Sequence, residues 1–118
     1  GSTGIPKGVV VSHRGVIDYI DWAIETFHID STSVIGNQAP FYFDNSTLDI
    51  YLMYATGATL NIIPDTFFAF PAKLVEYLDE KKITFVFWVP FVLVNMANFK
   101  ILDSRKPQYL RDVFLLVR

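Results

Sequence analysis

The sequence contains no cysteine and no long uninterrupted hydrophobic run. Without cysteine the chain has no disulfide framework, no thiolate nucleophile and no cysteine-based metal site. The longest apolar stretch, residues 83–94, is interrupted by Thr84 and Pro90 and is well short of the roughly 20 residues that span a bilayer. The first residues also lack the basic and then apolar pattern of a secretion signal. These absences lead us to expect a cytoplasmic protein that crosses no membrane.

The charge is nearly balanced, and aromatic residues are abundant. A net charge of −2 gives no electrostatic case for nucleic acid or an anionic membrane, because such partners require clustered Lys and Arg. A small molecule or another protein is the expected partner. A hydrophobic share of 52% over 118 residues is enough for the core of one domain. The aromatic share of 16% is high for a free-standing domain and indicates surface that something else covers.

Strand and helix patterns alternate along the chain. The apolar spacing predicts helices over residues 13–28, 45–56 and 70–80 and after Pro90, with Ser12 as the cap of the first helix and Gly57 as the stop of the second. Strands are expected at residues 9–11, near residue 33, and over residues 58–64, 83–89 and 112–117. This order predicts an α/β fold with a mainly parallel sheet and helices on both faces, formed by residues 1–118 as one unit.

The opening stretch GSTGIPKGV has the composition of a loop that binds polyphosphate. Such a loop needs small residues that let the backbone approach, hydroxyl donors and a cation, and here these are Gly1, Ser2, Thr3, Gly4, Lys7 and Gly8. The spacing differs from the Walker loop, because Gly8 rather than Ser or Thr follows Lys7. A plain solvated turn, with Gly1 and Ser2 left from a tag, is the alternative on composition alone.

The same stretch in register resembles the phosphate-binding signature of the acyl-adenylate-forming superfamily, [ST]-S-G-[ST]-T-G-x-P-K-G-V. The match runs from Gly1 to Val9 and extends to the pair Ser12 and His13. In that family the loop holds the β- and γ-phosphates of ATP. The resemblance therefore implies ATP as cofactor, with Mg²⁺ arriving on it, since no His, Asp or Glu spacing indicates a protein-built metal site. It assigns the phosphate contacts to Ser2, Thr3, Gly4 and Lys7.

A second motif is FYFDNSTLD, in which Asp44 follows three aromatic residues just before a predicted helix. Asp44 or Asn45 could simply cap that helix, with Asp49 supporting its first turn. The resemblance favours another role, since amino-acid-activating members of the superfamily carry F-D-x-S at this place and use the Asp to bind the α-amino group of the substrate. By the same resemblance Asn45 and Leu48 point toward the pocket for the substrate side chain.

The motifs together imply an ATP-dependent ligase that activates an amino acid as its adenylate and releases pyrophosphate. The aminoacyl group would then pass to the phosphopantetheine thiol of a carrier protein. The surrounding sequence is most similar to D-alanine–carrier-protein ligases and amino acid adenylation domains. We assign no catalytic residue, and Phe85, Phe87, Trp88, Phe91 and Val94 are expected to form scaffold. An acyl- or aryl-CoA ligase, and a non-catalytic nucleotide-binding or interaction module, remain as alternatives.

The resemblance covers nearly all of this chain, whereas enzymes of the superfamily run to several hundred residues. The adenine-binding segment, the ribose-binding Asp, the hinge and the small C-terminal domain with its catalytic Lys all follow the region that matches. We therefore expect residues 1–118 to be an internal piece of the large N-terminal domain and to be inactive alone.

Overall fold

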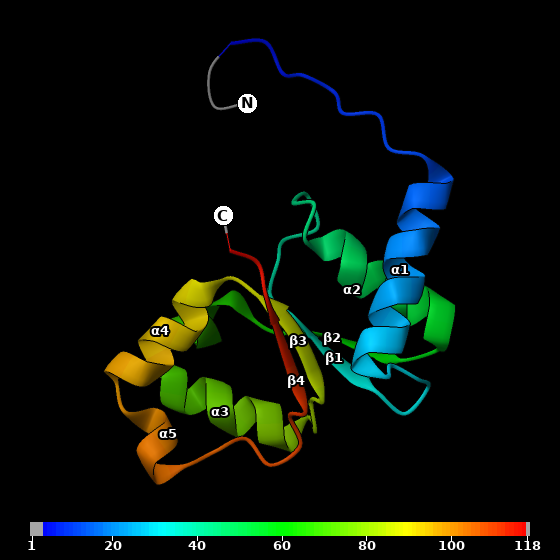
Figure 1. Cartoon of the computed structure of the whole chain (residues 1–118). Helices are drawn as coiled ribbons and strands as arrows, with labels where there is room; N and C mark the ends of the chain where they lie inside the picture. The colour runs from blue at the N-terminus through cyan, green and yellow to red at the C-terminus, as the bar shows by residue number, and fades with distance from the viewer. Residues whose placement is uncertain (1–3, 118) are drawn as a thin grey trace.

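The structure is a computed structural model that describes residues 4–117. Within that range a four-stranded parallel sheet forms the centre of the molecule (Figure 1), with strand order β2-β1-β3-β4. The strands are β1 (Val34–Asn37), β2 (Thr59–Ile62), β3 (Phe85–Trp88) and β4 (Asp112–Leu115). The predicted parallel sheet is confirmed, and each strand lies inside the stretch expected for it.

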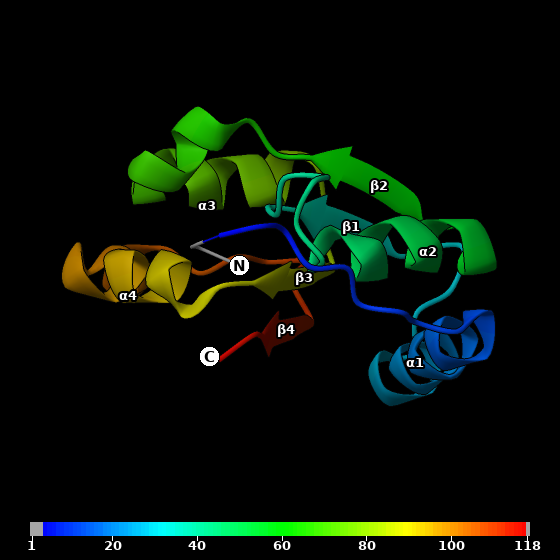
Figure 2. The ribbon, with the colours of Figure 1, turned by 90° about the horizontal axis from the view of Figure 1, so that it is seen from above.

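Helices cover both faces of the sheet, as predicted (Figure 2). The helices α1 (His13–Phe27) and α2 (Ser46–Thr56) lie on one face, and α3 (Pro71–Glu80) and α4 (Pro90–Asn98) lie on the other. A 3-10 helix η1 (Asp65–Ala69) and the short α5 (Ile101–Ser104) complete the elements, and neither was expected.

Strand β3 shows why the sheet has two cores. All four of its residues are buried, and successive side chains of a strand point to opposite faces. Phe85 and Phe87 pack with α1 and α2, whereas Val86 and Trp88 pack with α3 and α4. A strand buried on both sides reads as a continuous apolar run, which explains the sequence ITFVFWV.

Residues at the helix ends explain where the helices begin and where α2 ends. The Ser12 hydroxyl accepts a hydrogen bond of 3.0 Å from the Gly15 amide, so Ser12 caps α1 as predicted. Gly57 ends α2 with a φ of 75°, a left-handed conformation that glycine adopts without a Cβ clash. Both α3 and α4 begin with proline, which is pre-organised for the first helical position.

The expectation of a strand at residues 9–11 is wrong. This segment is extended but pairs with none of the four strands, and Val10 is 99% exposed. Three consecutive β-branched residues favour extended backbone, but a strand also needs a hydrogen-bonding neighbour, and no described strand supplies one. The segment instead leads away from α1 on the side of the molecule where the C-terminal end of the chain emerges (Figure 1).

The strand order creates a divergence at the carboxyl ends of β1 and β3. These two strands are neighbours in the sheet, but the chain leaving β1 enters α2 on one face and the chain leaving β3 enters α4 on the other. Parallel α/β sheets bind their ligands in the crevice formed at such a switch point. A ligand site is therefore expected at the loops that follow Asn37 and Trp88.

Candidate functional site

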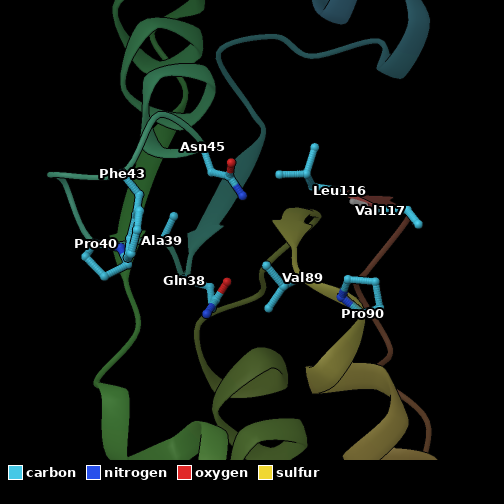
Figure 3. A pocket seen from close by; sticks show the side chains of 9 residues that line it. All are labelled: Gln38, Ala39, Pro40, Phe43, Asn45, Val89, Pro90, Leu116 and Val117. Atoms are coloured by element: carbon cyan, nitrogen blue, oxygen red, sulfur yellow. The ribbon is translucent and has the colours of Figure 1, made fainter. Parts of the chain in front are cut away.

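An open cavity of about 440 Å³ lies at this switch point (Figure 3). Its wall comes from the loop after β1, the β3–α4 junction and the chain after β4. The lining residues are Gln38, Ala39, Pro40, Phe43, Asn45, Val89, Pro90, Leu116 and Val117. The wall is mostly apolar, with the amides of Gln38 and Asn45 directed into the space (Figure 3). Such a lining, apolar with a few polar groups, is typical of small-molecule sites.

A second open cavity of about 710 Å³ shares Asn45 and Leu116 with the first. It lies toward α1, and Asp44, Thr47, Phe87, Tyr19, Val16, Gly15 and Val11 complete its lining. The two cavities thus meet at Asn45 and Leu116. Together they offer an apolar space with a carboxylate at one side.

Backbone and hydroxyl bonds fold the loop that carries this carboxylate. The Phe43 amide donates to the Pro40 carbonyl at 2.9 Å, and the Thr47 amide donates to the Asp44 carbonyl at 3.0 Å. The Ser46 hydroxyl donates to the Phe43 carbonyl at 2.7 Å and lies 3.3 Å from the Phe41 carbonyl. The serine of the F-D-N-S motif therefore closes the loop onto the start of α2.

The structure places two of the three predicted substrate residues at the cavities. Asp44 is solvent-exposed at the wall of the second cavity, and Asn45 lines both. Asn45 is also the N-cap of α2, but its side chain makes no capping hydrogen bond. Leu48 is 1% exposed in the core between the sheet, α1 and α2, and it lines neither cavity. Its contact with a substrate stays a prediction.

The residues predicted to bind phosphate lie in the N-terminal segment. Ser2 and Thr3 are outside the described residues. Gly4 has a φ of 83°, a conformation that favours glycine. Apart from chain neighbours, no atom of residues 4–117 lies within 4 Å of the position that a Cβ would take at Gly4 or Gly8. Lys7 is solvent-exposed. The segment passes above the carboxyl-end edge of the sheet (Figure 2), so these residues are on the side of the cavities.

A buried polar pair beneath the loop was missed by the sequence analysis. Asp49 is 0% exposed, and its Oδ2 accepts a 2.9 Å hydrogen bond from Asn37 Nδ2. Burial raises the pKa of Asp49 to about 7, and the hydrogen bond from Asn37 acts in the opposite direction. The pair joins the end of β1 to the first turns of α2. One signal was available, namely a polar residue at the end of an apolar strand.

Tyr19 on α1 is the other titratable group affected here. Burial raises the pKa of its hydroxyl, and the negative charges of Asp49 and Asp44 raise it further. Tyr19 lines the second cavity with Asp44. The phenol therefore stays neutral at physiological pH and keeps its hydroxyl proton in that wall.

The family model for AMP-binding enzymes matches residues 1–115. The chain belongs to the AMP-binding enzyme family. Among curated relatives, the L-proline–[L-prolyl-carrier protein] ligase of Pseudomonas fluorescens is 38% identical over 98 residues, or 83% of this chain. The D-alanine–D-alanyl carrier protein ligase of Bacillus cytotoxicus is 42% identical over 83 residues, or 70% of this chain. The matches span 20% and 16% of those two proteins, so this chain corresponds to a small part of each.

Solved structures of similar proteins superpose on this chain over most of its length. The nonribosomal peptide synthetase FmoA3 superposes with a TM-score of 0.74 at 30% identity, covering 88% of this chain and 11% of that one. CmiS6 superposes with a TM-score of 0.77 at 29% identity, covering 96% of this chain and 27% of that one. The resemblance to the adenylate-forming superfamily drawn from the opening loop and F-D-N-S is confirmed by these matches.

In this member of the AMP-binding enzyme family, Phe87 belongs both to the hydrophobic core and to the lining of the second cavity. It is 3% exposed and stacks on Phe114 with ring centroids 4.6 Å apart, as a core residue does. Yet its side chain also lines the cavity that holds Asp44. The assignment to scaffold holds for Phe85 and Trp88 and is incomplete for Phe87, which faces both the core and the cavity. It is wrong for Phe91 and Val94, which are 62% and 52% exposed on α4.

Between residues 4 and 117 no three His, Cys, Asp or Glu side chains are grouped so as to hold a metal ion. No helix in the same range is long and apolar enough to span a bilayer.

Proposed function

We propose that the protein carrying this chain activates an amino acid with ATP and passes it to a carrier protein. The observation that carries the proposal is the position of Asp44, a carboxylate on the F-D-N-S loop beside an apolar cavity at the switch point. Asp44 is solvent-exposed at the cavity wall, and a substrate that fills the apolar cavity displaces water there, which strengthens the attraction between this carboxylate and an ammonium group. Two of the relatives bear names that describe amino acid ligation to carrier proteins, which supports this substrate class.

The proposed reaction has two steps. A carboxylate oxygen of the amino acid attacks the α-phosphorus of ATP, and the bond to pyrophosphate breaks, which leaves an aminoacyl-adenylate. The phosphopantetheine thiol of the carrier protein then attacks the carbonyl carbon, and AMP departs as the thioester forms. Asp44 would hold the α-ammonium group, and Asn45 would contact the substrate at the junction of the cavities. No covalent enzyme nucleophile is needed, since positioning and charge stabilisation drive such chemistry.

The N-terminal loop suits the phosphates of ATP. The open space around Gly4 and Gly8 permits close approach of phosphate to the backbone, and Lys7 supplies positive charge. We extend the same role to Ser2 and Thr3 from the motif. ATP carries phosphates whose charge Mg²⁺ would offset, with no metal ligand needed from this chain. The cytoplasmic location expected from the sequence stays a prediction.

The test is amino-acid-dependent ATP–pyrophosphate exchange in the full-length protein. The panel pairs each amino acid with the same acid lacking the α-amine, for example alanine with propionate and proline with cyclopentanecarboxylate. We expect exchange with at least one amino acid and little with its partner. Exchange driven only by fatty or aryl acids would favour a CoA ligase instead. Nucleotide binding with no acid-dependent exchange would favour a non-catalytic module.

Replacing Phe87 by alanine is expected to widen the cavity and shift the amino acid preference toward larger side chains. The same change removes core contacts, and we expect a loss of about 3 kcal/mol in the free energy of unfolding. Phe85→Ala is the matched control, because Phe85 is buried on the same face of β3 but lines neither cavity. Exchange rates across the panel and denaturant unfolding measure both effects. An equal shift of preference in both variants would contradict the role of Phe87.

A further inference from the structure

The loop that carries Asp44 is fixed at its start by one side chain. Asn37, the last residue of β1, is 3% exposed and donates from Nδ2 to two acceptors. One is the Ala39 carbonyl at 3.1 Å, and the other is Asp49 Oδ2 at 2.9 Å. An amide nitrogen carries two hydrogens, so both are used and the plane of the amide is fixed.

The hydrogen bond to Asp49 on α2 orients the side-chain amide of Asn37. Asp49 lies on α2, four positions after Asn45, and is completely buried, and its Oδ2 accepts the hydrogen bond from Asn37. With that oxygen in place, Asn37 directs its remaining hydrogen to Ala39, which lines the first cavity. At the other end of the loop the Ser46 hydroxyl holds the Phe43 carbonyl. The loop from Gln38 to Asn45 is thus tied at both ends, and the start depends on Asp49.

We propose that Asp49 is a positioning residue for the amino acid site, which holds the start of the Asp44 loop in place through Asn37. This proposal rests on the proposed function, because it takes the substrate bound by Asp44 to be an amino acid. Asp49 itself touches neither cavity, so it acts on the site through Asn37 and Ala39.

Burial of the Asp49 carboxyl group lowers the stability of the fold, which points to a role other than packing. Its second oxygen, Oδ1, is buried without a hydrogen-bond partner among the described residues. Buried polar atoms are nearly always paired, and an unpaired one lowers stability. Leucine at this position would pack among the same apolar neighbours without that penalty. Leucine, however, offers no acceptor to Asn37, so the loop would lose its tie to α2.

The test compares Asp49→Leu with Asp49→Asn in the full-length protein. Leucine removes the acceptor, and we expect the amino acid KM to rise about tenfold while the KM for ATP stays within about twofold. Asparagine keeps an acceptor oxygen, and we expect it to restore the amino acid KM to within about threefold of the wild-type value. Leu52→Ala is the control for lost stability, because Leu52 is buried on the same helix and its side chain offers no hydrogen-bond acceptor to Asn37. An equal rise in KM for Leu52→Ala would overturn the proposal.

A second readout does not depend on activity. Amide hydrogen exchange over residues 38–45 should become faster in Asp49→Leu and stay at the wild-type rate in Asp49→Asn. If Asp49→Leu does not fold, Asn37→Ser takes its place, because the shorter side chain cannot reach both acceptors. Unchanged exchange in the loop and unchanged KM would overturn the positioning role. A wild-type protein without amino-acid-dependent pyrophosphate exchange would instead refute the proposed function, and the loop measurement would still decide the role of Asp49.

Discussion

Replacing Asp44 by alanine is expected to lower kcat/KM for the amino acid by about 100-fold, because the substrate ammonium group loses its partner in an apolar cavity. The cavity wall around Asp44 contains Phe87, Leu116 and Val16, so few other groups there can offset the positive charge. Asp44→Asn should lose almost as much, since it keeps the shape and removes the charge. Steady-state ATP–pyrophosphate exchange in the full-length protein measures the effect.

Two comparisons separate this loss from general damage. Any residual exchange with the matched acid that lacks the amine should be unchanged or higher in Asp44→Ala, because such a substrate carries no ammonium group for Asp44 to bind. Asp18→Ala is the control substitution, since Asp18 is an exposed carboxylate on α1 whose Oδ2 lies 3.9 Å from Arg14 Nε. Equal losses with and without the amine would contradict ammonium binding by Asp44.

Asp49→Asn is expected to make the protein more stable at neutral and alkaline pH. The pKa of Asp49 is about 7 in the folded state, against the ordinary value of 3.8. The folded state therefore binds the more protons between these values, and the free energy of unfolding falls as pH rises through this window. One pKa unit corresponds to about 1.4 kcal/mol, so the wild-type protein should lose about 4 kcal/mol between about pH 4 and about pH 8. Asparagine does not ionise, so the Asp49→Asn variant should not lose this part of the free energy of unfolding as pH rises.

Denaturant unfolding of both proteins across this pH range measures the difference. The stabilisation by asparagine should be small at the acid end, grow as pH rises toward about 7 and then stay constant. Asp18→Asn controls for removing a carboxylate from the surface, because Asp18 is exposed. Stability curves of wild type and Asp49→Asn that run parallel over the whole range would show that Asp49 carries its charge without cost.

Local sequence predicted the four strands of the sheet and the four longer helices, but not η1, α5 or the contacts between elements. Apolar runs predicted the strands of the sheet, and Ser12 and Gly57 marked the helix ends, because those signals are local. The strand at residues 9–11 was wrong, since strand formation depends on a neighbour that local sequence does not reveal. Asp44 and Asn45 could be placed at the site because the F-D-N-S motif sits in the loop that ends at the switch point.

The rest of the site depends on packing between distant segments. The hydrogen bond from Asn37 to Asp49 joins residues 12 positions apart and exists only once α2 packs on β1. Leu48 is buried in the core beneath α2, a position that depends on how the helix packs, and its contact with a substrate stays a prediction. Phe87 lines a cavity because β3 ends there, which an uninterrupted apolar run does not disclose.

The most direct test of the account follows the oxygen atoms of the substrate. The full-length protein is given ATP and an amino acid whose carboxylate is labelled with oxygen-18, and hydroxylamine or the carrier thiol accepts the aminoacyl group. A carboxylate oxygen that attacks the α-phosphorus stays on AMP when the carbonyl carbon is released, so mass spectrometry should find one labelled oxygen in each AMP. Unlabelled AMP, or label in inorganic phosphate together with ADP, would contradict adenylation of an amino acid by this protein.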